Sequence, residues 1–210
     1  MDDRDRVLAR ARLVAAGDRA ALTFETRTAP GRCAQLVREV VSPALGLGQN
    51  GWPVAVKALE YAVANRSDRW AAHYERAARD LGLARAGGEP EPGDVLYWPY
   101  AGRDGRAYGH TAVYLGGGLC LENTDHRTRG ERPYGRGPVR VTPLAAMGAP
   151  STVAAVSREA LELPEPPALP PKLEVVTLNL NGAEFPVEAA RVVGSTLWVR
   201  TKRAPRKEPT

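Results

Sequence analysis

The sequence predicts an α+β protein in which helices come first, an antiparallel sheet follows, and a small β unit ends the chain. Three observations support this prediction. Apolar residues recur at helical spacing through the first 82 residues. From residue 87 onward, short apolar runs alternate with turns that are rich in glycine. Five prolines within residues 162–171 then separate a last group of short strands from the rest.

We predict helices at 2–17, 33–41, 53–65 and 67–82. Each has apolar residues three and four positions apart on one face. The first is stopped by Gly17, and the second by Ser42-Pro43, because the residue before a proline avoids the helical conformation. Residues 23–31 between them are expected to form a loop. His73 lies among charged residues on the last helix and is expected to be an exposed surface histidine.

Five strands are predicted for the next part of the chain, at 95–98, 110–115, 119–122, 139–141 and 153–156. Three consecutive glycines at 116–118 favour a tight hairpin between the second and third of them. The segment 124–138, rich in arginine and glycine, is expected to be a polar loop. Beyond the prolines, strands are predicted at 174–180, 183–187 and 196–201. The dipeptide Asn181-Gly182 predicts a hairpin turn between the first two of these.

These elements divide the chain into a domain over 1–160, a proline-rich linker over 161–172, a small β module over 173–202 and a basic tail over 203–210. The formal net charge is +5, and the last ten residues carry four basic side chains and one acidic one. The body is therefore nearly neutral, and it shows no basic helix with interleaved aromatic residues. We expect no specific nucleic-acid partner. The tail is either a solvated terminus or a weak attractor of polyanions such as an anionic cell wall.

Neither a membrane nor a metal ion is predicted as a partner. No apolar run approaches the ~20 residues that a bilayer crossing needs. The first residues mix acids with bases, so we expect synthesis in the cytoplasm without a secretory signal peptide. Cys33 and Cys120 are too few for a disulfide scaffold, and their spacing excludes a CxxC-type zinc site. We interpret both as free thiols, and predict a monomer without a cofactor.

Three residues in chain order indicate nucleophilic catalysis. Cys33 stands at a predicted helix start, where the positive end of the helix dipole favours a thiolate. His110 opens a strand, and a histidine beside a thiol can later protonate a leaving amine. Glu122 stands on the next strand, where a carboxylate would fix the imidazole tautomer. Because residues alternate between the two faces of a strand, we favour Glu122 over its neighbour Asn123 as the residue that orients His110.

Other polar residues near these positions are expected to have lesser roles. The backbone N–H of Cys33 is the favoured oxyanion donor, and Gln35 is expected on the helix surface. Asp94 is interpreted as a turn residue, and Cys120 as a small core thiol.

The motif around His110 resembles a known family. Residues 90–123 contain Pro-Gly-Asp, an apolar strand, Gly-His, a second apolar strand, a glycine turn and a polar residue. This resembles the second half of the NlpC/P60 and CHAP group of papain-like peptidoglycan hydrolases. The segment Gly31-Arg-Cys-Ala-Gln-Leu-Val37 resembles the helix that bears the nucleophile in that group. The resemblance covers roughly residues 25–125 in order, and the stretch between 45 and 88 has no clear counterpart.

The resemblance implies a papain-like fold and a cysteine amidase or endopeptidase that cleaves peptidoglycan through an acyl-enzyme on Cys33. A phage endolysin, which acts on the cell wall after release, is one such enzyme. His110 would be the general base and acid, with Glu122 or Asn123 as the third residue. Two alternatives stay open. One is a non-catalytic wall-binding or structural module on the same scaffold. The other is a thiol protease or acyltransferase with a substrate outside the wall.

The substrate pocket is where the sequence departs most from that group. Trp98 and Gly109, close to the motif, are the predicted substrate-binding residues. Arg32 and Ala34 stand where the group commonly has Asp before and Ser after the nucleophile. These departures concern the substrate pocket more than the thiol chemistry.

The C-terminal strands resemble a second kind of module. The segment that begins at Val176 is similar to small β modules called copper-amine-oxidase N-terminal-like, which accompany cell-wall proteins. The sequence of this unit shows no cluster of metal ligands. The other interpretation is a β extension that stabilises the enzyme.

Overall fold

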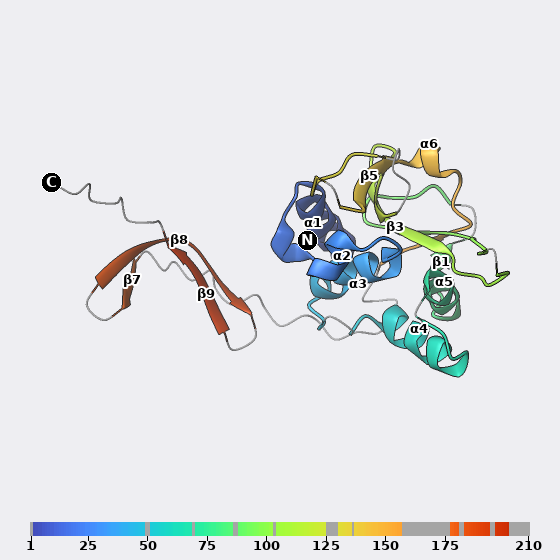
Figure 1. Cartoon of the computed structure of the whole chain (residues 1–210), viewed down its shortest axis with the longest axis horizontal. Coiled ribbons are helices and arrows are strands. Elements are labelled where there is room, and N and C mark those ends of the chain that lie inside the picture. The colour runs from blue at the N-terminus through green and yellow to red at the C-terminus, as the bar shows by residue number, and fades with distance from the viewer. Residues whose placement is uncertain are drawn as a thin grey trace. The chain divides into compact units, whose positions relative to one another are not determined.

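The chain forms two compact units, Met1–Glu165 and Pro166–Thr210 (Figure 1). This computed structural model describes residues 2–48, 51–68, 70–85, 88–102, 104–124, 130–135, 137–156, 177–180, 183–193 and 196–201. The first unit combines helices with an antiparallel sheet, and the second contains a small antiparallel sheet, so the protein is α+β. Over the described residues, every helix is too short or too polar to cross a bilayer.

The helices of the first unit are α1 (Asp3–Ala15), α2 (Phe24–Thr28), α3 (Cys33–Ala44), α4 (Pro53–Ala64), α5 (Ala71–Asp80) and α6 (Leu144–Met147). A 3₁₀ turn, η1 (Arg19–Ala21), follows α1. The prediction of a loop over 23–31 was wrong for its first part. Thr23 caps α2 there, because its hydroxyl accepts a hydrogen bond from the backbone N–H of Thr26.

The end of α3 also differs from the prediction. The helix continues through Pro43, which we expected to stop it, and ends at Ala44. Proline cannot donate to the carbonyl four residues before it, here that of Glu39. Arg10 of α1 supplies the missing donor, since its Nε lies 3.0 Å from the Glu39 carbonyl oxygen. A contact from another helix therefore satisfies the acceptor that a proline leaves open.

His73 is not the exposed surface residue that the sequence predicted. Helix α5 begins at Ala71 rather than at 67, and His73 lies in its first turn with only 9% of its surface exposed. Its Nδ1 accepts a hydrogen bond from the backbone N–H of Trp70 at 3.3 Å. The imidazole ring also stacks on the Trp70 indole, with 5.6 Å between ring centroids. His73 is thus part of the cap of α5.

The sheet of the first unit has the strand order β1-β6-β2-β3-β4-β5, with every pair antiparallel. Its strands are β1 (Ala84–Arg85), β2 (Val95–Trp98), β3 (His110–Gly116), β4 (Leu119–Asn123), β5 (Val139–Pro143) and β6 (Thr152–Ala154). Strand β1 was not predicted, because two residues are too short to show an alternating pattern. The hairpin between β3 and β4 turns at 116–118, where all three glycines have positive φ.

The main core lies between the helices and one face of this sheet. Helix α3 packs against β3 and β4, and α1 packs against both α3 and β3 (Figure 1). Val37 and Val40 of α3 and Val113 and Leu121 of the sheet are completely buried there. A smaller cluster on the opposite face contains Cys120, a free and buried cysteine. Packing of α3 onto the sheet fixes the place of its first residue, Cys33.

The second unit consists of β7 (Thr177–Leu180), β8 (Ala183–Val193) and β9 (Thr196–Thr201), paired in that order. Strand β8 is longer than the predicted 183–187, because its second half pairs with β9 up to Val193. The predicted linker 161–172, the turn at Asn181-Gly182 and the tail 203–210 lie outside the described residues, as do residues 125–129 and 136 of the predicted polar loop.

Candidate active site

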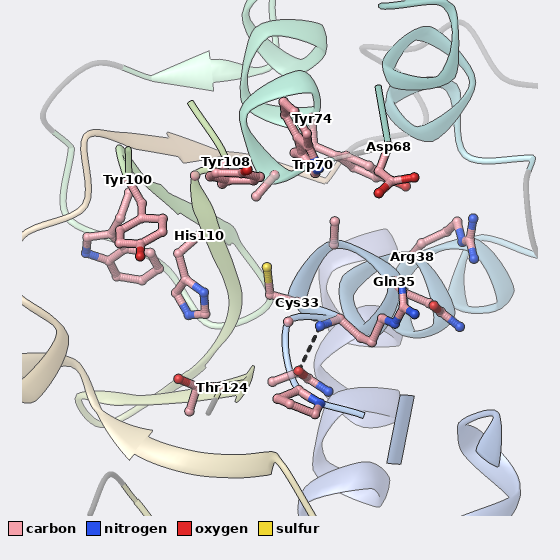
Figure 2. A pocket seen from close by; sticks show the side chains of 18 of the residues that line it. Cys33, Gln35, Arg38, Asp68, Trp70, Tyr74, Tyr100, Tyr108, His110 and Thr124 are labelled. Carbon is pink, nitrogen blue, oxygen red and sulfur yellow. Dashed lines mark hydrogen bonds between the residues drawn. The ribbon is translucent and has the colours of Figure 1, made fainter. Parts of the chain in front are cut away.

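The structure places Cys33, His110 and Glu122 together. Cys33 is the first residue of α3, His110 is the first of β3, and Glu122 lies in β4. The Nε2 atom of His110 is 2.7 Å from Oε2 of Glu122. Figure 2 shows the Cys33 sulfur facing the imidazole ring of His110. Because Glu122 occupies Nε2, Nδ1 is the ring nitrogen that remains for the thiol.

The register of the β3–β4 hairpin explains why His110 and Glu122 meet. Ala112 is the direct partner of Glu122, so His110, two residues earlier, is its diagonal neighbour on the same face. The carboxylate is completely buried, and its second oxygen is also occupied, because Thr142 of β5 donates to Oε1 at 2.5 Å. Arg140, the cross-strand partner of Glu122 on β5, is buried too, and the two opposite charges attract each other. Glu122 is therefore held on both oxygens.

The environment of His110 strongly favours its protonated form. Burial by itself lowers the pKa of the imidazole. The hydrogen bonds to Cys33 and Glu122, together with the charges of these two groups, outweigh burial and raise the pKa of His110 to about 9. At neutral pH the ring therefore carries a positive charge that stabilises a thiolate on Cys33.

Asn123, the alternative third residue, makes other contacts. Its Oδ1 accepts a hydrogen bond from the backbone N–H of Arg32 at 2.9 Å, and its Nδ2 donates to the carbonyl oxygens of Thr26 and Ala29 at 2.8 and 3.1 Å. These bonds fasten the segment that leads into α3. Asn123 thus positions the backbone before Cys33, and Glu122 is the residue that contacts the imidazole.

The backbone N–H of Cys33, the predicted oxyanion donor, lies at the start of α3. Cys33 opens α3, and the first N–H groups of a helix have no acceptor within that helix. They also lie at the positive end of the helix dipole, where a developing negative charge is stabilised.

Trp98 and Gly109 both line the cleft at the site, in different ways. The Trp98 ring lies beside His110, with 5.8 Å between ring centroids, and its Nε1 donates to the carbonyl of Gly148. Gly109 has a φ of +68°, and a Cβ there would lie 2.7 Å from the backbone nitrogen of Ala72. Gly109 is thus required where the strand approaches the start of α5, and Trp98 offers a side chain to a ligand.

Cys33 and His110 line an open cleft of about 870 Å³. Sequence reasoning missed most of its aromatic wall, in which the Trp70 and Tyr108 rings are 4.5 Å apart and Tyr100 lies 6.5 Å from Tyr108. The two tyrosines flank the turn that precedes His110. Their closeness to His110 in the sequence was the one indication that they would line the cleft. On the other side of Cys33 from His110, the cleft is lined by Arg38 and Asp68 (Figure 2).

Gln35 and Asp94 have structural contacts. Gln35 donates to Oε1 of Glu39 at 2.9 Å and to the Thr23 hydroxyl at 3.2 Å, which ties α3 to the start of α2. Asp94 is a buried turn residue that pairs with Arg85 at 2.5 Å. Burial raises the pKa of the Asp94 carboxyl, although the charge of Arg85 opposes this shift.

Within the described residues, no group of three His, Cys, Asp or Glu side chains is arranged to hold a metal ion. Comparisons with models of known families, with curated proteins and with solved structures give no match for this chain. Any assignment of function must therefore come from the site itself.

Proposed function

We propose that this protein is a cysteine hydrolase that cleaves amide bonds, with Cys33 as the nucleophile. The observation that supports this most is that Cys33 and His110 line an open cleft while the buried Glu122 lies behind the imidazole, with 2.7 Å between His110 and Glu122. Such an arrangement lets a protonated imidazole stabilise the thiolate while a buried carboxylate fixes the ring. We also propose that the fold is papain-like, with the nucleophile helix packed on an antiparallel sheet.

In the acylation step, the Cys33 sulfur attacks the carbonyl carbon of the substrate and forms a C–S bond. The negative charge that develops on the carbonyl oxygen is stabilised by the N–H of Cys33. When the C–N bond breaks, the electron pair stays on nitrogen and His110 donates its proton to it. The amine leaves, and the acyl group remains on Cys33 as a thioester. Glu122 keeps the imidazole in place throughout.

In the deacylation step, His110 is neutral and accepts a proton from a water molecule. The water oxygen attacks the thioester carbonyl, and the C–S bond breaks to release a carboxylic acid. The thiolate returns to Cys33 beside an imidazolium, so the site is restored. This step requires water in the cleft, and its open shape allows water to enter.

For the substrate, we propose the peptide part of bacterial peptidoglycan. The motifs around Cys33 and His110 resemble those of the NlpC/P60 and CHAP hydrolases, and the cleft has the size that several peptide residues need. Aromatic side chains along one wall offer apolar contact area for such a ligand.

The test is digestion of purified sacculi, with released fragments identified by mass spectrometry. We expect fragments from the wild type and none from Cys33→Ala. Cys120→Ala is the matched control, since that thiol is completely buried and is not among the described residues that line the cleft, and it should release the same fragments as the wild type. If Cys33→Ala digests sacculi as well as the wild type does, the proposal is wrong. If sacculi stay intact but the wild type hydrolyses other peptides, the substrate is wrong and the chemistry holds.

A further inference from the structure

Arg38 is a cation of the cleft whose charge is not balanced by an ion pair with any described residue. It lies on α3, five residues after Cys33, and lines the cleft. Its Nε is enclosed and has no hydrogen-bond partner, and no ion pair joins Arg38 to any side chain in the described part of the chain. Because Arg38 lines the cleft, the charge of its guanidinium is available to a ligand bound there.

The neighbouring charges show that this situation is specific to Arg38. Arg32, which also lines the cleft, forms an ion pair with Glu25 at 2.5 Å. Glu39, next to Arg38 in the sequence, is buried and accepts hydrogen bonds from Thr23 and other residues at the start of α2. Arg32 and Glu39 have these partners within the fold, whereas Arg38 has no ion pair with any residue that the structure describes.

A half-buried guanidinium without a partner is costly, and a carboxylate is the group that best removes this cost. The planar guanidinium can bind both carboxylate oxygens at once through charge-assisted hydrogen bonds. Asp68 lines the cleft near Arg38 and carries the opposite charge, but no ion pair joins them (Figure 2). The negative charge of Asp68 would repel a ligand that brings two carboxylates to this part of the cleft. The site therefore favours a ligand with a single carboxylate, bound by Arg38.

The position of Arg38 indicates which part of the substrate it meets. His110 protonates the leaving amine, so the leaving group lies on the His110 side of Cys33. Arg38 lies on the other side of Cys33 (Figure 2), where the acyl part of the substrate remains. Five residues of helix correspond to roughly 7.5 Å along the axis, about the length of two extended residues.

We propose that Arg38 binds a carboxylate in the acyl part of the substrate, about two residues from the bond that is cleaved. This inference rests on the proposed function, since it uses the thiol chemistry of Cys33 to orient the substrate. It assigns the enzyme a preference for acidic peptides over neutral peptides of the same shape.

The test measures alkylation of Cys33 and does not require hydrolysis. The probes are N-bromoacetyl-glycyl-alanine and its carboxamide, whose carboxylate or amide group lies about two residues from the reactive carbon. Each rate is divided by the rate of the same probe with glutathione. In the wild type, we expect the normalised alkylation rate of the carboxylate probe to exceed that of the carboxamide probe by about tenfold. One charge-assisted hydrogen bond contributes a free energy of this size. In Arg38→Gln the ratio should fall to about one, with the carboxamide rate unchanged.

Arg32→Gln is the matched control, because it removes the same charge from the same cleft. Its ratio should stay within about twofold of the wild type, since Glu25 already balances Arg32. In the wild type itself, raising the salt concentration from 0.05 to 0.5 M should reduce the ratio severalfold. This measurement stands even if Arg38→Gln does not fold.

Equal ratios in the wild type and Arg38→Gln, or a wild-type ratio near one at low salt, would overturn the inference. The two proposals fail in different ways. If no peptide is hydrolysed but the carboxylate probe is still preferred through Arg38, the hydrolase proposal fails and the binding site remains. If peptides are hydrolysed but the carboxylate probe is not preferred, the hydrolase proposal remains and the carboxylate site at Arg38 is wrong.

Discussion

The starts of β3 and α5 each hold a histidine, and the two histidines behave in opposite ways. His110 begins β3 between a thiol and a buried carboxylate, and its pKa rises to about 9. His73 lies in the first turn of α5, where burial lowers its pKa, the backbone of Asp68 opposes that shift, and the charge of Arg76 adds to it. Burial disfavours the charged form of both. The comparison shows that acidic partners, and not burial, make His110 suited to proton transfer.

The largest expected effect comes from removing the acidic partner of His110. Glu122→Gln keeps the shape of the side chain and removes its charge, so the imidazolium loses one of the two neighbours that stabilise it, the other being Cys33. We expect peptide hydrolysis to fall by about 10²- to 10⁴-fold, as for the orienting carboxylate of other triads. The pKa of His110, followed by NMR titration of its ring protons, should fall from about 9 toward its ordinary value.

Asn123→Asp provides a contrast to Glu122→Gln. It replaces an amide by a carboxylate in the side chain next to Glu122, at a position that contacts the backbone before α3. It should leave the pKa of His110 above 8, although it weakens two hydrogen bonds to backbone carbonyls. A His110 titration that is the same in the wild type and in Glu122→Gln would break the comparison, because the carboxylate would then not be the cause of the shift.

A smaller effect on the rate of hydrolysis is expected at Thr142, which contacts Glu122 and not the His110 imidazole itself. Thr142→Val removes the hydroxyl that donates to Oε1 of Glu122 and preserves its volume. The carboxylate then loses one of the contacts that orient it, and we expect kcat to fall about tenfold with KM nearly unchanged, typical of groups that orient a catalytic side chain. Thr142→Ser should restore most of the rate. If Thr142→Val raises KM and leaves kcat intact, Thr142 is not a positioning residue.

Part of this site could be predicted from the sequence because its contacts are local. Three glycines set the β3–β4 turn, and the alternation of strand residues then brings His110 and Glu122 to one face. The contact of Thr142 with Glu122 could not be predicted, because it depends on how β5 pairs across the segment 124–138. The role of Asn123 depends on a contact with a segment more than 90 residues earlier.

The partners of charged side chains and the first residues of helices were also features that the sequence did not predict. Arg32 and Arg38 look alike in the sequence, and only the fold places Glu25 beside one of them. His73 was predicted to be exposed because the helical pattern was extended back to residue 67. The actual start at Ala71 places this histidine at the cap, where it accepts a backbone hydrogen bond. Local periodicity therefore predicts which elements form, while their ends and partners depend on packing.

The smallest expected effects are on stability, and they have opposite signs at the two histidines. The raised pKa of His110 contributes stability that is fully present below the unfolded value of about 6.5 and is lost as the pH rises from there to about 9. The lowered pKa of His73 contributes in the other direction, because stability is lost as the pH falls below about 6.5.

Urea unfolding at several pH values, with His110→Gln and His73→Gln beside the wild type, separates the two contributions. Each substitution also has a cost that does not depend on pH, so the informative quantity is how the difference from wild type changes with pH. That difference should shrink from pH 6.5 to 9 for His110→Gln and from pH 6.5 downward for His73→Gln. A His73→Gln difference that stays constant below pH 6.5 would mean that the ring is protonated as readily in the folded protein as in the unfolded chain. The cap of α5 would then tolerate a positive charge, although the ring accepts a hydrogen bond from Trp70 and lies at the positive end of the helix dipole.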